Sequence, residues 1–354
     1  MTYNVPTMAE IEKIRGTNGY NLISTFSGCG GSCLGFEMAG YNVLWANEFI
    51  EEARNTYKAN HPNVILNGED IRKVTAEQIL EEVNTTEIDV LEGSPPCASF
   101  SMAGSREKAW GREKKYSDSV QRADDLFFEY VRLVRGLKPK VFVAENVTGL
   151  VRGKAIGYFK TIMTELRSSG YVVGAKILDA SYLGVTQARQ RLILIGVRRD
   201  LSEKYNLLPV FPTPMNTRYV LKDILVTNDK RITHDPETNR DITLDAYALG
   251  VEYDKIMIGQ QSDKYFQLVR PALNKPIGTI TATGGNVGAA SVTHPIEKRK
   301  FTLGELRALS SFPEDFILTG TYEQRWERIG RSVPPLMMKA VAESVKVNIL
   351  DKIL

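Results

Sequence analysis

The chain has 354 residues, of which 43% are apolar and 25% are charged, and its formal net charge is +3. This length and composition predict a folded protein with a large core and two domains. The net charge is too small to indicate nucleic acid as a partner by itself. No run of about 18 apolar residues occurs, and the first residues lack the basic and then apolar pattern of a secretion signal. We therefore expect no membrane span and a cytoplasmic location.

The chain contains three cysteines, Cys29, Cys33 and Cys97, and three histidines. Three cysteines cannot all pair with one another, and Cys29 and Cys33 have no second pair of metal ligands nearby. The sequence therefore predicts no disulfide framework, no structural zinc ion and no other metal site. A free Cys97 suits a reducing compartment and a thiol that must remain reactive.

Short apolar segments alternate with segments of helical periodicity along residues 1–200. The first helix begins near Cys33 and stops at Gly40, and the later ones are predicted at 50–60, 76–83, 123–135 and 158–168. This alternation favours a doubly wound, Rossmann-like α/β sheet of about seven strands. The predicted strands are 22–26, 43–46, 64–66, 88–91, 141–144, 171–178 and 192–197.

The alternation is lost in the segment 201–296. Prolines at 209, 212 and 214, a glycine cluster between Gly278 and Gly288, and short β-rich pieces such as 253–258 predict a smaller, irregular, β-rich domain there. Helical periodicity returns from Leu303, and a final helix is predicted at 336–350. We expect residues 1–200 and 297–354 to form a catalytic domain and residues 201–296 to form a domain that recognises the substrate.

Polar residues follow the first three predicted strands. Gly28, Gly30 and Gly31 form a turn after the first strand, Glu48 follows the second, and Asp70 follows the third. A carboxylate at Glu48 can accept hydrogen bonds from both ribose hydroxyls, and Asp70 can accept one from an adenine amino group. Taken singly, each residue has a structural alternative, in which the glycines make a sharp turn, Glu48 caps the next helix and Asp70 is a turn residue. Together they predict a site for adenosine.

The kind of adenosine cofactor follows from the glycine spacing. The turn lacks the full Gly-x-Gly-x-x-Gly pattern with which a dinucleotide site holds a pyrophosphate at a helix N-terminus. S-adenosylmethionine carries no phosphate and needs no such arrangement. The sequence therefore favours S-adenosylmethionine over a dinucleotide.

A thiol and a carboxylate follow the next two predicted strands. Cys97 comes after strand 88–91, and Glu145 ends strand 141–144. Because the carboxyl ends of parallel strands form the ligand crevice of an α/β sheet, we expect the two groups to converge on one substrate. The run Pro95-Pro96-Cys97-Ala98-Ser99-Phe100-Ser101 resembles the catalytic motif of the DNA (cytosine-5) methyltransferases, and Glu145-Asn146-Val147 is similar to another signature of that family.

The resemblance implies a covalent mechanism. Cys97 would add to carbon 6 of cytosine, which makes carbon 5 nucleophilic, and a protonated Glu145 would donate to ring nitrogen 3. Asn146 would hold the cysteine loop, and Pro95-Pro96 would make its turn rigid. The structural alternative for Cys97 is a buried, unreactive cysteine.

Two arginines precede the last predicted strand, in the pattern Gln187-x-Arg189-x-Arg191. Strand alternation would send both guanidinium groups to one face, where they could hold the pyrimidine carbonyl and a flanking phosphate. Alternating arginines are also common on a solvated strand edge. Resemblance to the family's eighth motif favours the functional interpretation, with Arg189 on the pyrimidine and Arg191 in the same cluster.

The same resemblance implies S-adenosyl-L-methionine as the cofactor and S-adenosyl-L-homocysteine as its product. Segment 299–313 resembles the ninth motif, and 330–334 resembles the tenth, which completes the cofactor pocket. Two departures occur, because Arg331 stands where the family has asparagine and Ser310-Ser311 replaces a stretch that contains glutamine. The implied cofactor residues are Phe26, Gly28, Cys29, Gly30, Gly31, Glu48, Phe49, Asp70, Ile71, Pro96, Leu126, Ser332 and Val333.

The substrate base must leave the duplex, because a stacked cytosine hides both faces of carbon 6. Segment 101–119 resembles the family's mobile loop, which closes over the extruded base, and its alternative is a solvated surface loop. Base choice is expected to come from 201–296, with Thr279-Ile280 similar to a short recurrent piece of that domain. The predicted DNA contacts are Ser101, Arg106, Lys108, Arg112, Thr279 and Ile280.

The sequence thus predicts a DNA (cytosine-5) methyltransferase that works as a monomer on double-stranded DNA in the prokaryotic cytosol or nucleoid. We expect an orphan modifier or the protective half of a restriction system with a separate cognate endonuclease. An RNA methyltransferase of the same fold is disfavoured by Phe100-Ser101 after the cysteine and by the sizeable segment 201–296. A binding module with an inactive site is disfavoured by the intact Cys97 and Glu145, and a dinucleotide-dependent oxidoreductase by the glycine spacing.

Overall fold

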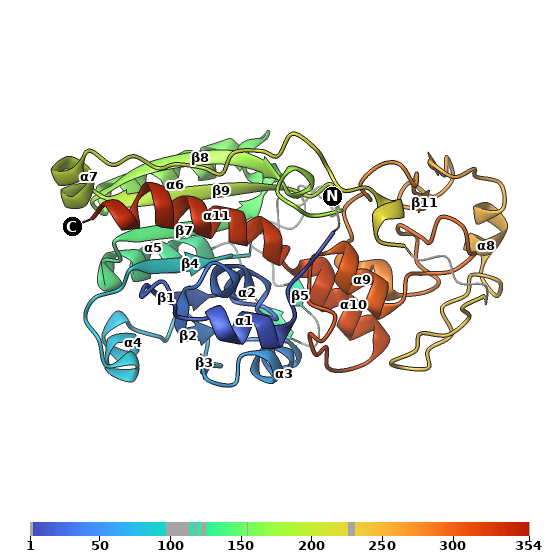
Figure 1. Ribbon diagram of the computed structural model, residues 1–354, viewed down its shortest axis with the longest axis horizontal. Coiled ribbons are helices and arrows are strands. Elements are labelled where there is room, and N and C mark those ends of the chain that lie inside the picture. Colours follow the sequence, from blue (N-terminus) through green and yellow to red (C-terminus); the bar gives the residue numbers. More distant parts are fainter. Residues whose placement is uncertain are drawn as a thin grey trace. The chain divides into compact units, whose positions relative to one another are not determined.

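The computed structural model describes residues 3–96, 114–116, 119–121, 125–153, 155–225 and 231–353 (Figure 1). The chain divides into two compact units. Unit 1 includes most of the predicted recognition domain, 201–296, together with residues on either side of it. The assignment of 201–296 to recognition stays a prediction. Unit 1 consists of Met1–Ile11, Asp179–Arg189 and Pro214–Met337, and unit 2 consists of Glu12–Leu178, Gln190–Thr213 and Met338–Leu354.

Unit 2 is built on a seven-stranded sheet, and all seven predicted strands are confirmed. The strands are β1 (Asn21–Thr25), β2 (Asn42–Asn47), β3 (Ile65–Asn67), β4 (Val90–Gly93), β7 (Val141–Val147), β8 (Tyr171–Asp179) and β9 (Gln190–Arg198). Their order across the sheet is β3-β2-β1-β4-β7-β9-β8. The central strands β4 and β7 are buried along almost their whole length, as expected for a sheet that is covered on both faces.

The strands of this sheet do not all run in one direction. β1 pairs in parallel with β2 and β4, β2 with β3, and β4 with β7. β9 runs antiparallel to β7, with Arg191 opposite Val147. Residues at the start of β9 therefore lie at the same edge of the sheet as residues at the end of β7.

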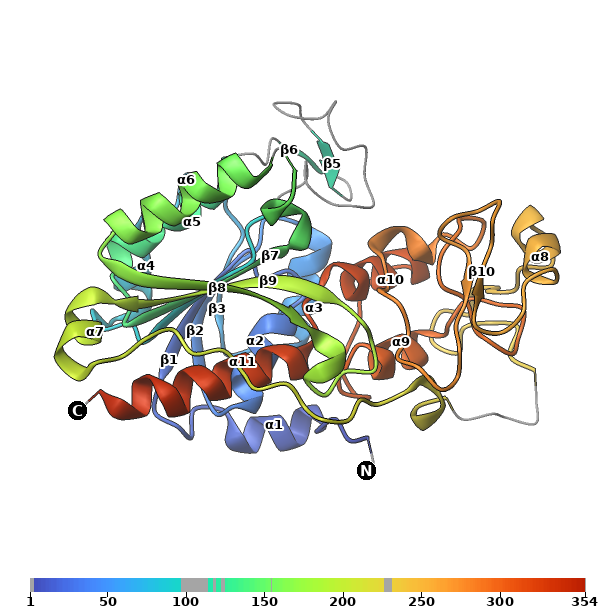
Figure 2. The same cartoon turned by 90° about the horizontal axis from the view of Figure 1, so that it is seen from above.

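Helices cover both faces of the sheet. Figure 2 shows α4 (Ala76–Val83), α5 (Leu126–Leu137) and α6 (Ala155–Ser168) on one side, and α2 (Gly31–Met38) and α11 (Pro335–Asn348) on the other. A large apolar cluster, which includes Trp45, Phe127, Tyr130 and Phe142, packs against the first side. The other elements are α1 (Met8–Ile14), α3 (Glu51–Asn60), α7 (Arg199–Tyr205), η1 (Thr148–Val151), η5 (Leu350–Lys352), and the paired strands β5 (Lys114–Tyr116) and β6 (Ser119–Gln121).

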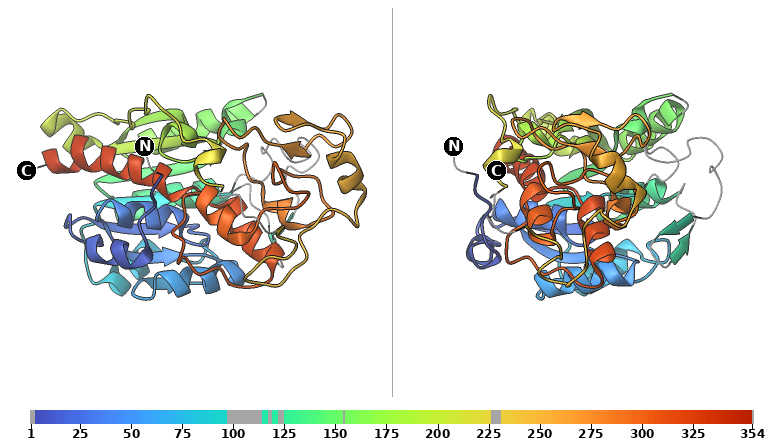
Figure 3. Two further views of the ribbon diagram at one scale, coloured as in Figure 1. Left: turned by 45° about the vertical axis from the view of Figure 1, so that its right-hand side comes forward. Right: turned by 90° about the vertical axis from the view of Figure 1, so that its right-hand side faces the viewer.

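Unit 1 is mostly irregular, as Figure 3 shows, and its described strands are the two-residue pair β10 (Gln260–Gln261) and β11 (Val269–Arg270). The segment 253–258, which was predicted to be extended, instead contains the end of α8 (Ala248–Tyr253) and turns. Capping boxes begin α9 (Leu303–Leu309) and α10 (Tyr322–Arg331), because a threonine precedes each helix and a Glu or Gln stands at its third position. Unit 1 also contains η2 (Ala180–Tyr182), η3 (Leu221–Asp223) and η4 (Ala282–Gly285).

None of the helices in the described part of the chain is long and apolar enough to cross a membrane.

Candidate functional site

The turn after β1 has an unusual backbone. Phe26, Gly28 and Gly30 all have positive φ angles, of 55°, 58° and 94°. Main-chain hydrogen bonds hold the turn, because Ser27 N–H donates to the Asn47 carbonyl at 3.0 Å and Gly30 N–H donates to the Ser27 carbonyl at 2.9 Å. A bulky residue such as Phe26 rarely adopts a positive φ, and such strained positions cluster at ligand sites.

Two glycines of this turn have different surroundings. A Cβ at Gly28 would meet no described atom within 4 Å, whereas a Cβ at Gly30 would lie 2.4 Å from His61 Nε2. The buried His61 is fixed in turn, because its Nδ1 lies 3.0 Å from the Glu37 carboxylate. Gly30 is therefore required for packing inside unit 2, while Gly28 leaves space that a ligand can fill.

Glu48 follows β2, and its carboxylate is aimed at the glycine turn. Oε2 accepts a hydrogen bond from Gly28 N–H at 2.8 Å, and Oε1 accepts one from Ile50 N–H at 2.7 Å. The bond to Ile50 N–H lies at the start of α3. Glu48 therefore also caps this helix, which is the structural alternative given in the sequence analysis. These two bonds orient the Glu48 carboxylate beside the glycine turn.

Asp70 follows β3 and is engaged with a cation. Its carboxylate pairs with Arg72 at 3.1 Å, and Arg72 also pairs with Asp125 at 2.7 Å. The side chain of Asp70 remains 30% exposed, which leaves it accessible to a ligand group.

The remaining predicted cofactor residues of this region differ in exposure. Phe49 is 39% exposed, while Cys29, Ile71 and Leu126 are buried, and Gly31 begins α2. An oriented carboxylate, an open glycine and an accessible aromatic ring at successive strand ends suit an adenosine group. The residues present therefore fit S-adenosylmethionine.

The turn after β4 leads to the predicted nucleophile. Asn146 Nδ2 donates to the Pro95 carbonyl at 3.0 Å, and Asn146 Oδ1 accepts from Val147 N–H at 2.9 Å. Asn146 thus connects the end of β7 to the turn, in which Pro96 is partly buried. Cys97, Ser101, Arg106, Lys108 and Arg112 lie outside the described residues.

Glu145, near the end of β7, forms an ion pair with Arg191. The Arg191 Nε to Glu145 Oε1 distance is 2.8 Å, and the two side chains are 15% and 10% exposed. Burial lowers the pKa of Arg191, and the neighbouring carboxylate opposes this effect. The pair forms because β9 is antiparallel to β7, which places Arg191 diagonally across from Glu145.

Arg189 does not behave as the alternation argument predicted, and this is a correction. β9 begins at Gln190, so Arg189 is not part of the alternating strand, and it belongs to unit 1. Its buried guanidinium donates to the carbonyls of Ile280, Gly330 and Arg331, at 3.2, 3.0 and 3.3 Å. Within unit 1 it therefore ties its own segment to Ile280 and to the end of α10.

The predicted DNA contact by Ile280 is also corrected. The residue is 1% exposed, its N–H donates to Gln187 Oε1 at 3.2 Å, and its carbonyl accepts from Arg189. Thr279 Oγ1 donates to the Ala188 carbonyl at 3.0 Å. Thr279 and Ile280 thus anchor the segment 277–280 to residues 187–189 inside unit 1. Their hydrogen-bonding groups are directed at residues 187–189, and the Ile280 side chain is buried.

The two departures from the family pattern have local partners in unit 1. Arg331 pairs with Glu327 at 2.6 Å, one helical turn earlier on α10. Ser310 Oγ accepts from Gln187 Nε2 at 3.0 Å, and Ser311 Oγ accepts from Leu336 N–H at 3.1 Å. Ser332 ends α10 and Val333 is buried, and their predicted contact with the cofactor stays a prediction.

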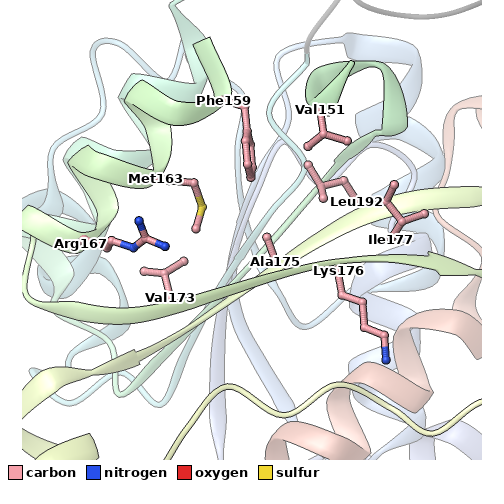
Figure 4. A pocket seen from close by; sticks show the side chains of 9 residues that line it. All are labelled: Val151, Phe159, Met163, Arg167, Val173, Ala175, Lys176, Ile177 and Leu192. Carbon is pink, nitrogen blue, oxygen red and sulfur yellow. The ribbon is translucent and has the colours of Figure 1, made fainter. Parts of the chain in front are cut away.

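An open groove of about 420 Å³ lies between α6 and two strands of the sheet, the edge strand β8 and its neighbour β9 (Figure 4). Phe159 and Met163 of α6 face Ala175 and Leu192 of the strands across it. The groove contains none of the predicted site residues, and it lacks the carboxylates that an adenosine or a cytosine would require.

Glu92, a buried residue close to the turn that precedes Cys97, was not singled out by the sequence analysis. Glu92 lies in β4, is 1% exposed and accepts hydrogen bonds from serine hydroxyls. The signal that could have found it is a glutamate inside an apolar strand, between Leu91 and Gly93, because charged residues are rarely buried without a reason.

Comparison with known proteins gives a consistent result. The sequence model of one family, described as C-5 cytosine-specific DNA methylase, matches residues 20–347. The type II methyltransferase M.Bsp6I of a Bacillus species is 33% identical over 341 residues, which are 93% of this chain and 99% of the relative. The type II methyltransferase M1.HphI of Haemophilus parahaemolyticus is 30% identical over 339 residues, which are 91% of this chain and 86% of the relative.

Solved structures share the fold. One, described as a DNA modification methyltransferase encoded within an Escherichia coli prophage, aligns with a TM-score of 0.69 at 23% identity, over 94% of this chain and 99% of its own. The Dnmt2 methyltransferase of S. pombe aligns with a TM-score of 0.62 at 15% identity, over 94% of this chain and 99% of its own.

Proposed function

The chain belongs to the C-5 cytosine-specific DNA methylase family, which methylates carbon 5 of cytosine in DNA with S-adenosyl-L-methionine, and from that premise we propose which residues perform the reaction. Cys97 is the nucleophile, Glu145 and Arg191 serve the cytosine ring, and Asn146 positions the cysteine turn. The observation that carries this proposal is the Glu145–Arg191 ion pair. The residue after Glu145 is Asn146, whose side-chain amide donates to the Pro95 carbonyl.

Each residue has a defined step. The Glu145 carboxylate, which is paired with Arg191, first takes up a proton from solvent. The Cys97 thiolate then forms a bond to carbon 6, and the negative charge that reaches ring nitrogen 3 is met by that proton. When bound, S-adenosylmethionine supplies the electrophilic methyl group for carbon 5. A solvent water molecule accepts the proton from carbon 5, and the electron pair of that bond re-forms the double bond between carbons 5 and 6 and expels the Cys97 thiolate. Glu145 recovers its proton from ring nitrogen 3 as the ring regains aromaticity. Arg191 orients the Glu145 carboxyl group through these steps and is available to the pyrimidine carbonyl.

The cofactor is held, in this proposal, by the ends of β1, β2 and β3. Glu48 accepts from the ribose hydroxyls, Asp70 accepts from the adenine amino group, and Phe49 packs beside the cofactor. Gly28 allows its close approach, which is supported by the open space that a Cβ would fill there. Gly30 and Arg189 act as positioning residues, because the first packs on His61 and the second bonds to main-chain carbonyls.

We infer that the substrate is double-stranded DNA from which one cytosine is extruded, because carbon 6 is inaccessible in a stacked base. Segment 101–119 closes over the base, and segment 201–296 selects the target sequence. The two relatives described above are type II methyltransferases, which supports a protective role beside a separate endonuclease. We expect the protein to act as a monomer in the prokaryotic cytoplasm.

The function is tested by expressing the protein with a plasmid of random sequence and mapping 5-methylcytosine by bisulfite sequencing. Methylation at one short recurring sequence is expected. The Cys97→Ser variant should lose turnover and keep its affinity for S-adenosylhomocysteine. Cys33→Ala is the matched control, because this other cysteine is fully buried on α2 and should keep turnover. An active Cys97→Ser variant would remove Cys97 from the reaction.

The covalent step has its own test. DNA that contains 5-fluorocytosine at the mapped target should form a stable adduct with the wild-type enzyme, because carbon 5 then lacks the proton that must leave. The adduct should be absent with Cys97→Ser. An enzyme that methylates normal DNA but forms no adduct would exclude the addition of the thiol to carbon 6.

A further inference from the structure

Glu92 is buried in β4, and none of the steps above uses it. Its Oε2 accepts a hydrogen bond from Ser24 Oγ at 2.7 Å, and its Oε1 accepts from Ser32 Oγ at 2.7 Å and from Ser94 Oγ at 3.4 Å. These hydroxyls belong to β1, to the first turn of α2 and to the turn that precedes Cys97. One carboxylate therefore connects the end of its own strand with β1 and the first turn of α2, whose serines lie 68 and 60 residues earlier in the chain.

The connection continues into the glycine turn. Ser24 Oγ lies 2.9 Å from Ser27 Oγ, and Ser27 directly precedes Gly28. Ser24 and Glu92 are paired in register across β1 and β4, and Thr25 Oγ1 donates to the main-chain carbonyl of Glu92 at 3.2 Å. The glycine turn and the turn that leads to Cys97 thus leave the sheet from one pair of neighbouring strands. Glu92 bonds to Ser94 of the second turn directly and reaches Ser27 of the first through Ser24.

The environment of Glu92 makes its charge costly. Its hydrogen-bond partners among the described residues are hydroxyls rather than cations, and a buried carboxylate without a cation is destabilised. Burial raises the pKa of Glu92 to about 7, the serine hydroxyls act in the opposite direction, and the nearby Glu145 raises it further. Glu92 therefore changes its charge near neutral pH.

Other titratable groups face Glu92 from the surrounding elements. They are Cys33 of α2, Tyr57 of α3, Tyr130 of α5 and Glu145 of β7. Burial raises the pKa of Cys33, Tyr57 and Tyr130, so these three groups stay neutral across the neutral range. Glu145 is paired with Arg191.

We propose that Glu92 is a positioning residue that couples the glycine turn, and hence the cofactor, to the turn that carries Cys97. This rests on the proposed function, which assigns both turns to the site. Ionised Glu92 accepts hydrogen bonds at once from Ser24 and Ser32, which flank the glycine turn, and from Ser94 in the turn before Cys97, and so holds both turns. Protonated Glu92 carries a hydroxyl on one oxygen, so one of these bonds must reverse or break. Cofactor affinity therefore increases as Glu92 ionises.

The test is calorimetric titration of S-adenosylhomocysteine into the full-length protein from about pH 6 to about pH 8.5. The Kd of the wild type should fall about tenfold relative to that of Glu92→Gln across this range, which corresponds to about one charge-assisted hydrogen bond. The amino group of the ligand titrates equally with every variant, so the difference between wild type and variant isolates Glu92. Ser32→Ala, which removes one of the hydroxyls, should weaken binding mainly at the high end of the range.

Asp89→Asn is the matched control. Asp89 is a buried carboxylate at the opposite end of β4, where it accepts from Asn21 N–H at 2.8 Å and pairs with Lys140 at 2.8 Å. This variant should lose stability but keep the pH profile of cofactor binding. The proposal is overturned if Glu92→Gln and Ser32→Ala both keep the wild-type profile, or if Asp89→Asn changes it in the same way.

Failure of the coupling is distinguishable from failure of the proposed function. Methyl transfer by wild type and Cys97→Ser on the same plasmid reports on the reaction alone. If Glu92→Gln fails to fold, Ser32→Ala provides the binding profile, and a wild-type profile in that variant also overturns the proposal.

Discussion

Arg191 Nε lies 2.8 Å from Glu145 Oε1, because β9, which carries the arginine, runs antiparallel to β7, which carries the glutamate. Because both side chains are largely buried, removing the guanidinium leaves a carboxylate without its ion-pair partner at the reacting edge of the sheet. We predict that Arg191→Ala lowers the single-turnover rate of methyl transfer by about a hundredfold or more, while the Kd for S-adenosylhomocysteine stays unchanged.

The control for that variant is Arg135→Ala. Arg135 also pairs with a glutamate, Glu165, but its side chain is 48% exposed and lies far along α5 from the strand ends. Exposed pairs contribute little to stability, so this variant should keep both the rate and the melting temperature. Equal loss of rate in the two variants would contradict a specific role for Arg191.

Glu48→Gln should weaken cofactor binding without a large change in the rate at saturating cofactor. The amide that replaces the carboxylate accepts more weakly from Gly28 N–H and offers one oxygen instead of two, so we expect the Kd for S-adenosylhomocysteine to rise about tenfold or more. Glu51→Gln, in the exposed first turn of α3, is the control and should bind normally. Titration calorimetry checks both.

The two glycines of the turn should respond differently to alanine. Gly30→Ala places a Cβ 2.4 Å from His61 Nε2 at a φ of +94°, so we predict a loss of unfolding free energy of about 2 kcal/mol or more. Gly28→Ala meets no described atom, so its loss of stability should be smaller and its loss of cofactor affinity larger. Denaturant unfolding and ligand titration separate the two effects, and the reverse ranking would contradict the assigned roles.

The buried Glu92 predicts a pH dependence of folding stability. Its pKa is about 7 in the folded protein, against 4.5 as the ordinary value, so between these values the folded protein binds more protons than the unfolded one. The free energy of unfolding should therefore fall as pH rises through this window, by up to about 3 kcal/mol from this group. Glu92→Gln should remove that part of the slope. Urea unfolding of both proteins from about pH 5 to about pH 8 measures the difference, and parallel curves would contradict it.

Much of unit 2 could be predicted from the sequence, because apolar periodicity and turn residues are local signals. They gave all seven strands and the positions of Glu48, Asp70 and Glu145 at strand ends. The direction of β9 could not be predicted, since an apolar run reads the same in either direction. The pairing of Arg191 with Glu145 depends on that direction.

Other features depend on contacts between distant parts of the chain. Arg189 was assigned to the same face as Arg191 by strand alternation, but the strand starts one residue too late, and its guanidinium finds carbonyls from residues 280 to 331. Glu92 is held by Ser24 of β1 and Ser32 of α2, which are 68 and 60 residues away, and Gly30 is required by the ring of His61. No local pattern contains these partners.

Unit 1 is discontinuous in sequence, and the proposed recognition segment 201–296 covers only part of it. A chimaera that transplants only 201–296 would place the donor's Ile280 against the host's Gln187 and Arg189. Adding 179–189 alone would move the mismatch to the host's Ser310 and Gly330, which bond to Gln187 and Arg189. Successful grafts should therefore carry Asp179–Arg189 together with Pro214–Met337, so that these contacting segments of unit 1 come from one parent.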